Sequence, residues 1–120
     1  MDARQIIQNT AARTLEIETR TLEGLRASIN EAFIECVMAI YESEGRLVVT
    51  GIGKSAIVAQ KIVATLNSTG TPALFMHAAD AIHGDLGMIR TRDLVLCLSK
   101  SGETAEIDGV LSRLPRLVYR

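Results

Sequence analysis

The sequence predicts an α/β domain built on a parallel, doubly wound sheet. Three short apolar runs, at residues 46–50, 73–76 and 93–98, have the length and the aliphatic composition of buried strands. Helical patterns lie between these runs, and parallel strands need such crossover connections. A strand–helix–strand order with a further helix after the last strand is typical of right-handed parallel α/β sheets.

The predicted helices carry apolar residues at helical spacing. The first precedes the first strand, bends near Gly24 and ends before Gly45, because glycine favours the end of a helix. A second covers residues 55–66, a small helical or loop element covers residues 78–87, and a last helix can open at Glu103. The stripe of the first comprises Leu15, Leu22, Leu25, Ile29, Phe33, Val37 and Ile40. The face of the second comprises Ile57, Val58, Ile62 and Leu66.

The predicted sheet is small. About three strands are present, and residues 114–120 contain a possible short strand but no further strand–helix unit. If nothing followed it, the third strand would lie at an open edge. We therefore expect the N-terminal half of a doubly wound domain. Its parts are lead helices at residues 1–44, a partial sheet domain at 45–112 and an atypical tail at 113–120.

Composition narrows the classes of function. The 120 residues carry 13 basic and 14 acidic side chains. A net charge of -1 provides no positive electrostatic potential that would attract nucleic acid. Aromatic residues make up only 3%, so stacking platforms for single-stranded nucleic acid are not expected. Neither a secretory signal pattern nor an apolar run of about 18 residues is present, which predicts a cytoplasmic protein without membrane contact. Cys36 and Cys97 lack metal-ligand spacing and are expected to be buried and unpaired.

The first candidate site is the turn G-I-G-K-S-A at residues 51–56, between a strand and a helix. Glycines there let the backbone approach a ligand, and the helix N-terminus offers N–H groups to an anion. A nucleotide P-loop is excluded because Val48 stands where that motif needs glycine. The dinucleotide pattern G-x-G-x-x-A is satisfied, but the acidic residue that binds the ribose is missing after the second strand. A phosphate or sugar site using Lys54 and Ser55, and a plain turn with a solvated lysine, both remain open.

The second candidate site is the segment S-K-S-G-E-T at residues 99–104, directly after the third strand. The hydroxyls of Ser99, Ser101 and Thr104, with Gly102 and the following helix N-terminus, would form a compact phosphate cradle. An ordinary helix cap would have a similar sequence. The position at the carboxyl end of a parallel strand, where open α/β sheets bind ligands, favours the phosphate site.

The two histidines of the chain lie beyond the second strand. His83 is suited to proton transfer near neutral pH, whereas His77 is expected to be a histidine hydrogen-bonded at a strand end. A metal site of His77, His83 and Asp85 matches no standard ligand spacing, so no metal is expected. All three motifs follow strand ends, which places them at one edge of the sheet.

Taken together, these residues resemble a known family. Segments 51–55, 65–72, 81–88 and 99–104 run in the order found in the SIS (sugar isomerase) domain of arabinose-5-phosphate isomerases. The stretch H-G-D-L-G-M is the most specific of them. The resemblance implies a three-layer sandwich with a flavodoxin-like sheet. It also implies reversible conversion of D-ribulose 5-phosphate to D-arabinose 5-phosphate, without a cofactor, for the lipopolysaccharide sugar Kdo. The expected partners are a small phosphorylated sugar and further copies of the chain, as a dimer or tetramer.

The resemblance also implies roles for individual residues. Aldose–ketose isomerisation moves a proton between C1 and C2 through an enediol. This reaction requires a base, stabilisation of an oxyanion and binding of the phosphate group. Glu106 suits proton shuttling, Lys54 suits oxyanion stabilisation, and His83 suits ring opening or proton donation. The implied phosphate-binding positions are Gly53, Ser55, Ser99, Ser101, Gly102 and Thr104.

The sequence departs from the family pattern in three ways. Ala56 stands where the family commonly carries glycine, and Lys100 replaces a polar neutral residue, where it either strengthens phosphate binding or is solvated. Family members also continue with two more strands, a further catalytic histidine and often a pair of CBS domains. The sequence therefore leaves open an isomerase domain and a catalytically impaired module for sugar-phosphate binding or oligomerisation. A nucleotide-dependent oxidoreductase is disfavoured.

Overall fold

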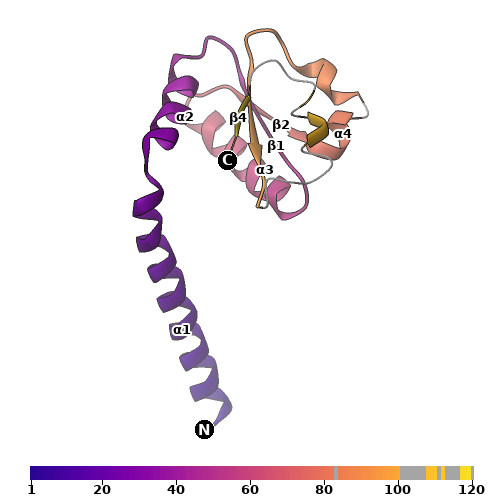
Figure 1. The fold of residues 1–120 in the computed structure, drawn as a ribbon. Coiled ribbons are helices and arrows are strands. Elements are labelled where there is room, and N and C mark those ends of the chain that lie inside the picture. Colours follow the sequence, from indigo (N-terminus) through magenta and orange to yellow (C-terminus); the bar gives the residue numbers. More distant parts are fainter. Residues whose placement is uncertain (83, 101–107, 111, 113–116, 120) are drawn as a thin grey trace. The chain divides into compact units, whose positions relative to one another are not determined.

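The computed structural model describes residues 1–82, 84–100, 108–110, 112 and 117–119. The chain divides into two compact units, Met1–Glu35 and Cys36–Arg120. Each unit is described by itself (Figure 1).

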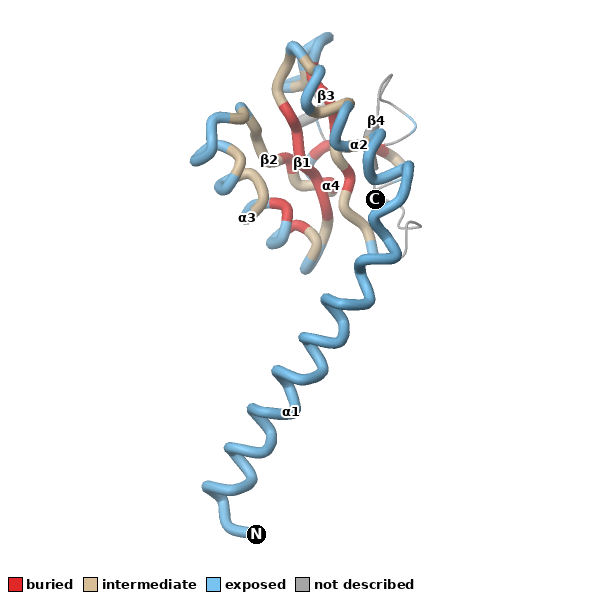
Figure 2. The backbone as a smooth tube through the Cα atoms, turned by 90° about the vertical axis from the view of Figure 1, so that its left-hand side faces the viewer, coloured by how far each residue is buried: buried red, intermediate tan, exposed pale blue. Residues whose placement is uncertain are grey.

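The first unit is dominated by one long helix, α1 (Ala3–Gly24). A capping box opens it: the Asp2 side chain accepts from the Gln5 N–H at 2.9 Å, and the Gln5 side chain accepts from the Asp2 N–H at 3.2 Å. The helix ends at Gly24, a short 3₁₀ turn η1 (Leu25–Ser28) follows, and α2 (Glu31–Glu42) continues into the second unit. The break predicted near Gly24 is therefore confirmed. No residue of α1 is buried (Figure 2).

The second unit contains a parallel sheet in the order β2-β1-β3-β4. The strands are β1 (Leu47–Gly51), β2 (Ala73–His77), β3 (Leu94–Leu98) and β4 (Leu117–Tyr119). The three predicted strands are confirmed to within a residue or two at each end. The sheet has one strand more than the three counted from the sequence, because the possible short strand in the tail pairs with β3 from Val95 to Cys97. The tail segment thus belongs to the sheet.

Helical segments cover both faces of the sheet, as a doubly wound fold requires. Successive strand residues point to opposite faces, so Val49 packs with Ala59 of α3 (Lys54–Ser68) while Val48 packs on the other side. The cluster around Val48 contains residues of α4 (Ala78–Ile82) and Val110. Between β1 and β2, α3 therefore lies on one face, and α4 and Val110 lie on the other. Figure 2 shows the buried residues concentrated in the strands.

The face that α3 buries differs from the predicted one. Ala56 and Ala59 are buried on the sheet and Ile62 is partly buried, whereas Ile57 and Val58 are 67% and 53% exposed. Small side chains let a helix approach a sheet closely, so the alanines decide the orientation and the branched residues at 57 and 58 remain outside. The prediction is correct for Ile62 and for Leu66, which also packs against this cluster.

The two cysteines differ in burial. Cys97 lies in the core on β3, and burial raises the pKa of its thiol to about 11, so the thiol stays protonated near neutral pH. Cys36 is only half-buried, contrary to the prediction, because α2 contributes no fully buried residue. Both are free thiols.

A buried carboxylate joins the amino ends of β1 and β3. Asp93 is 5% exposed and accepts from the Arg46 backbone N–H at 3.0 Å and from the Arg46 guanidinium at 2.7 Å and 3.2 Å. It also accepts from the Arg90 N–H at 2.8 Å. These bonds lower the pKa of Asp93 to about 2, the side-chain bond from Arg46 being the largest cause.

Among the described residues, no helix combines the length and apolarity needed to cross a bilayer.

Candidate functional site at the carboxyl edge of the sheet

The carboxyl ends of the three main strands lie in one row. Gly51 at the end of β1 pairs with His77 at the end of β2 and with Leu98 at the end of β3. The turn after β1 and the segment after β3 are therefore neighbours, because parallel strands in this register end together. The sequence prediction that these motifs share one edge is confirmed for the described residues.

The site lies where the chain path changes face. α3 follows β1 on one face of the sheet, and Val110, which follows β3, packs on the opposite face. β1 and β3 are neighbours, and the described residues that follow them, α3 and Val110, pack on opposite faces of the sheet. Open α/β sheets bind their ligands at this kind of switch point.

Two glycines shape the turn from β1 to α3. A Cβ on Gly51 would lie 2.9 Å from the backbone carbon of Ser55, so only glycine lets the strand end lie against the first turn of the helix. Gly53 precedes α3 with φ 61°, a left-handed conformation that glycine adopts without strain. No side chain caps α3 within the described chain, so its first N–H groups face the edge of the sheet.

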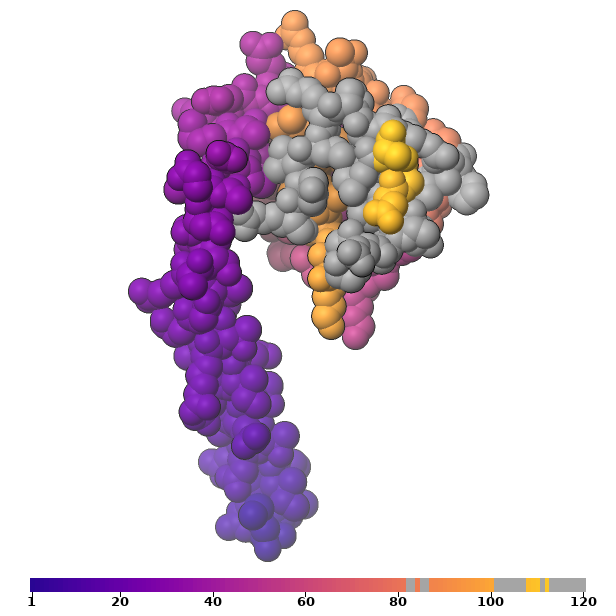
Figure 3. Space-filling view, in the orientation of Figure 1, coloured from indigo at the N-terminus to yellow at the C-terminus, as the bar shows by residue number. Residues whose placement is uncertain are grey.

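A shallow hollow of about 310 Å³ lies at this edge, between the start of α3 and the end of β3. Figure 3 shows the two segments side by side, α3 in pink and the end of β3 in orange. Two ammonium groups and two hydroxyls line the hollow together with two apolar side chains: Lys54, Lys100, Ser55, Ser99, Val58 and Leu98. The described lining residues include no carboxylate, so their chemistry suits an anion that also has some apolar surface.

His77 has the hydrogen-bonded role predicted for it. Its Nδ1 accepts from the Ala79 N–H at 3.2 Å, and its ring stands edge-on to Phe75 with the centroids 6.3 Å apart. Because Nδ1 is an acceptor here, the neutral imidazole carries its proton on Nε2.

The structure brings together four of the predicted site residues: Gly53, Lys54, Ser55 and Ser99. The remaining predicted positions, His83, Ser101, Gly102, Thr104 and Glu106, lie outside the described residues. The described part of the chain contains no group of three metal-ligating side chains, and His83 and the Asp85 side chain fall outside that part.

Sequence reasoning missed two residues that line the hollow. The pattern predicts Val58 and Leu98 as core residues of a helix and a strand, and their place in the lining follows only from the packing of α3 beside β3. Lys100, for which the sequence left phosphate binding and a solvated side chain open, also lines the hollow.

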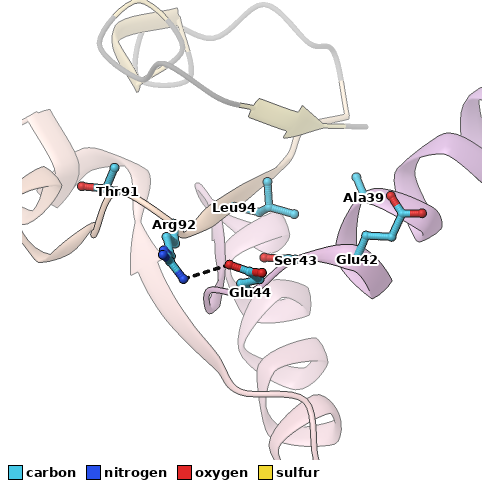
Figure 4. Close-up of a pocket in the computed structure, with 7 residues that line it drawn as sticks. All are labelled: Ala39, Glu42, Ser43, Glu44, Thr91, Arg92 and Leu94. Atoms are coloured by element: carbon cyan, nitrogen blue, oxygen red, sulfur yellow. Dashed lines mark hydrogen bonds and ion pairs between the residues drawn. The ribbon is translucent and has the colours of Figure 1, made fainter.

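A second hollow, of about 580 Å³, lies at the amino edge, lined in part by Glu42, Glu44 and Arg92 (Figure 4). Arg92 donates to the Glu44 carboxylate at 2.8 Å, so its charge is already compensated. With two carboxylates and one paired guanidinium, this lining does not suit an anion.

Comparison with known proteins identifies the family. The SIS domain family matches residues 39–116, which include the whole described edge. The chain belongs to the SIS domain family. Among its relatives, arabinose 5-phosphate isomerase GutQ of Shigella flexneri is 44% identical over 110 residues, 92% of this chain and 34% of that protein. Arabinose 5-phosphate isomerase KdsD of Pseudomonas aeruginosa is 47% identical over 109 residues, 91% of this chain and 33% of that protein.

A solved structure shares the fold over almost the whole chain. It is that of c3406 from E. coli CFT073 in complex with arabinose 5-phosphate, with a TM-score of 0.88 and 35% identity over 99% of this chain and 65% of that one. The similarity confirms the predicted α/β class and its flavodoxin-like sheet. The chain spans about a third of the length of the isomerases it matches.

Proposed function

We propose that this SIS domain chain carries the first part of a sugar-phosphate isomerase site for D-ribulose 5-phosphate and D-arabinose 5-phosphate. The hollow lined by Lys54, Ser55 and Ser99 is the observation that carries the proposal, because it offers cationic and hydroxyl donors at the sheet edge where ligands bind. Relatives named arabinose 5-phosphate isomerases, and a similar structure in complex with arabinose 5-phosphate, support the choice of sugar.

The proposed reaction is an internal redox exchange that needs no external electron acceptor. A base removes the proton from C2 of the open-chain aldose, an enediol forms, and the proton is delivered to C1. The hydroxyl proton on O2 passes to O1, so C1 becomes the alcohol and C2 the ketone. Catalysis requires the base, stabilisation of charge on the oxygens and a fixed phosphate.

We assign these tasks to the residues of the predicted motifs. Lys54, on the first turn of α3 and facing the hollow, stabilises the oxyanion. Glu106 shuttles the proton between the carbons, and His83 assists ring opening. The phosphate is held by Ser55, Ser99, Ser101 and Thr104, with Gly53 and Gly102 allowing close approach of the backbone.

The proposal also covers the cellular location and the oligomeric state of the enzyme. We place it in the cytoplasm, where its product would serve the synthesis of Kdo for lipopolysaccharide. The apolar side chains of Ile6, Leu15 and Leu22 in α1 are more than half exposed, so we expect further copies of the chain to cover them in a homo-oligomer.

Turnover of D-arabinose 5-phosphate to D-ribulose 5-phosphate tests the function directly. We expect turnover to fall by at least about 100-fold in Lys54→Ala and in Glu106→Ala, because each removes a group that acts in the transition state. Lys61→Ala is the matched control, since Lys61 is an exposed lysine of the same helix outside the hollow lining.

The outcomes separate the two functions left open by the sequence. Binding of D-arabinose 5-phosphate without turnover would identify a sugar-phosphate-binding module instead of an enzyme. Absence of both binding and turnover in the unmodified chain would overturn the proposed function.

A further inference from the structure

The second lysine of the hollow has no task in the isomerisation described above. Lys100 lies two residues beyond the end of β3 and lines the hollow together with Lys54 and Ser55 of α3. Both lysines are exposed, and within the described part of the chain neither has an ion-pair partner. Among the described residues, the hollow therefore presents two ammonium groups without a carboxylate partner, one from α3 and one from the segment after β3.

The amino edge differs in the pairing of its cations. There Arg92 is paired with Glu44 and Arg46 with Asp93, so two of the three arginines in the described lining of that edge are bound to a carboxylate. At the carboxyl edge the lining residues that the structure describes offer ammonium groups, hydroxyls and apolar carbon. Two like charges in one small hollow repel each other, and an anion with two negative charges removes that repulsion.

We propose that Lys100 is the cation of a dianion subsite, which selects the doubly ionised phosphate monoester of the sugar, while Lys54 faces the reacting oxygens. This inference rests on the proposed function. It adds the charge state of the ligand that the site binds and the residue that recognises this charge. A phosphate monoester carries about -1.5 to -2 charge at pH 7 with a second pKa near 6, so its second charge strengthens the attraction to Lys100 in a hollow that also contains the Lys54 ammonium group. A neutral sugar or a singly charged sugar acid leaves one lysine uncompensated. Lys100 is a binding residue in this scheme and takes no part in proton transfer.

Titration calorimetry with the full chain tests the assignment. The probes are D-arabinose 5-phosphate, inorganic phosphate and D-arabinose, each measured at several salt concentrations between pH 5 and 8. We expect Lys100→Gln to weaken binding of D-arabinose 5-phosphate by about tenfold or more, since a charge-assisted hydrogen bond is lost. Inorganic phosphate should lose a similar factor, and the weak binding of D-arabinose should not change.

Two further readouts distinguish a charge effect from a change in folding. In the unmodified chain, affinity for D-arabinose 5-phosphate should rise as pH increases through about 6, as the phosphate gains its second charge. This rise and the loss of affinity with added salt should both be smaller in Lys100→Gln. Lys100→Arg keeps the positive charge and should restore most of the affinity, while Lys61→Gln, the control outside the hollow lining, should leave every value unchanged.

The inference and the proposed function fail in different ways. If Lys100→Gln binds D-arabinose 5-phosphate with unchanged affinity, pH dependence and salt dependence, the dianion subsite is overturned and the isomerase proposal stands. If the unmodified chain binds no sugar phosphate, both are overturned.

Discussion

Thr50 is buried in β1 at 0% exposure, and its Oγ1 has no hydrogen-bond partner among the described residues. Its neighbours across the sheet are Met76 and Cys97. A buried hydroxyl that has lost its water without gaining a partner destabilises the folded state.

We therefore predict that Thr50→Val raises the free energy of unfolding by about 1 kcal/mol, because a methyl group of similar size replaces the unpaired hydroxyl. Urea denaturation of the two proteins measures the change. Thr50→Ser keeps the hydroxyl and removes the methyl group, and it should lower stability instead. A clear loss of stability in Thr50→Val would mean that the hydroxyl has a partner in solution.

Gly51 lies where the backbone of α3 approaches the end of β1. Gly51→Ala places a Cβ 2.9 Å from the Ser55 carbon and 3.0 Å from its oxygen, both of them backbone atoms that cannot rotate away. We predict a loss of roughly 1–3 kcal/mol in unfolding free energy, as for other overpacked sites. Gly87→Ala is the control, because nothing lies within 4 Å of the position of its Cβ and the expected change is below about 0.5 kcal/mol. Equal effects of the two substitutions would contradict the close approach at Gly51.

At the scale of single residues, sequence reasoning predicted the polar residues that line the hollow and missed the apolar ones. Lys54, Ser55 and Ser99 are found in the hollow because glycine, serine and lysine after a strand are unusual enough to signal a ligand. Leu98 carries no such signal, since an apolar residue at a strand end is expected in any core. Its place in the lining depends on how far α3 lies from β3.

At the scale of elements, Asn67 fixes α3 to the strand that follows it. Its side-chain amide donates to the Ala73 carbonyl at 3.0 Å and accepts from the Ala73 N–H at 2.9 Å. Ala73 is the first residue of β2, which is an edge strand of the sheet. The Asn67 amide therefore makes the backbone hydrogen bonds that a neighbouring strand would otherwise make at this position.

We predict that Asn67→Ala lowers the free energy of unfolding by about 1–2 kcal/mol, because two hydrogen bonds at a partly solvated edge are lost. The Ser68 hydroxyl donates to the Ala64 carbonyl at 2.9 Å within α3, so Ser68→Ala is a matched control on the same turn. That control should change stability by only a few tenths of a kcal/mol, since alanine favours the helix. Amide exchange at Ala73 would report the local opening. Unchanged exchange in Asn67→Ala would refute the role of this pair of hydrogen bonds.

Two elements show where pattern reasoning reaches its limit. The large apolar residues of α3 predict one orientation, yet Ala56 and Ala59 face the sheet because close packing favours small side chains there. β4 spans only Leu117–Tyr119, and a run of three residues after a proline has little strand signal of its own. Its backbone pairs with β3, and that pairing is a long-range contact that local propensity does not contain.

At the scale of the whole second unit, acid stability depends on Asp93. Its folded-state pKa of about 2 lies below the unfolded value near 3.9, so the ionised carboxylate stabilises the fold above about pH 4. This contribution, about 2 kcal/mol, is lost as pH falls from about 4 towards 2. The bonds from Arg46 and Arg90 are its cause, and they join the amino ends of β1 and β3.

We predict that Asp93→Asn lowers stability by about 2 kcal/mol at pH 7 and removes most of the loss between pH 4 and 2. Chemical denaturation at a series of pH values measures both effects. Glu44→Gln is the control, because the Glu44–Arg92 pair has side chains 76% and 74% exposed and such pairs contribute little. An unchanged acid profile in Asp93→Asn would assign the acid sensitivity to other groups.

The sequence alone determined the α/β class, the positions of the three main strands along the chain and the family. Apolar periodicity and the glycine and serine turns, from which these were predicted, are local properties of the chain. It also identified the lysine and the hydroxyls that carry the proposed chemistry. Only the tertiary structure decided that Gly51, His77 and Leu98 end in one row, that β4 joins the sheet, and that Lys54 and Lys100 line one hollow. The physical reason is that register and close approach depend on contacts between segments far apart in the chain. Lys54 and Lys100 lie 46 positions apart in the sequence (100 minus 54), and the register of β1 with β3 makes them neighbours.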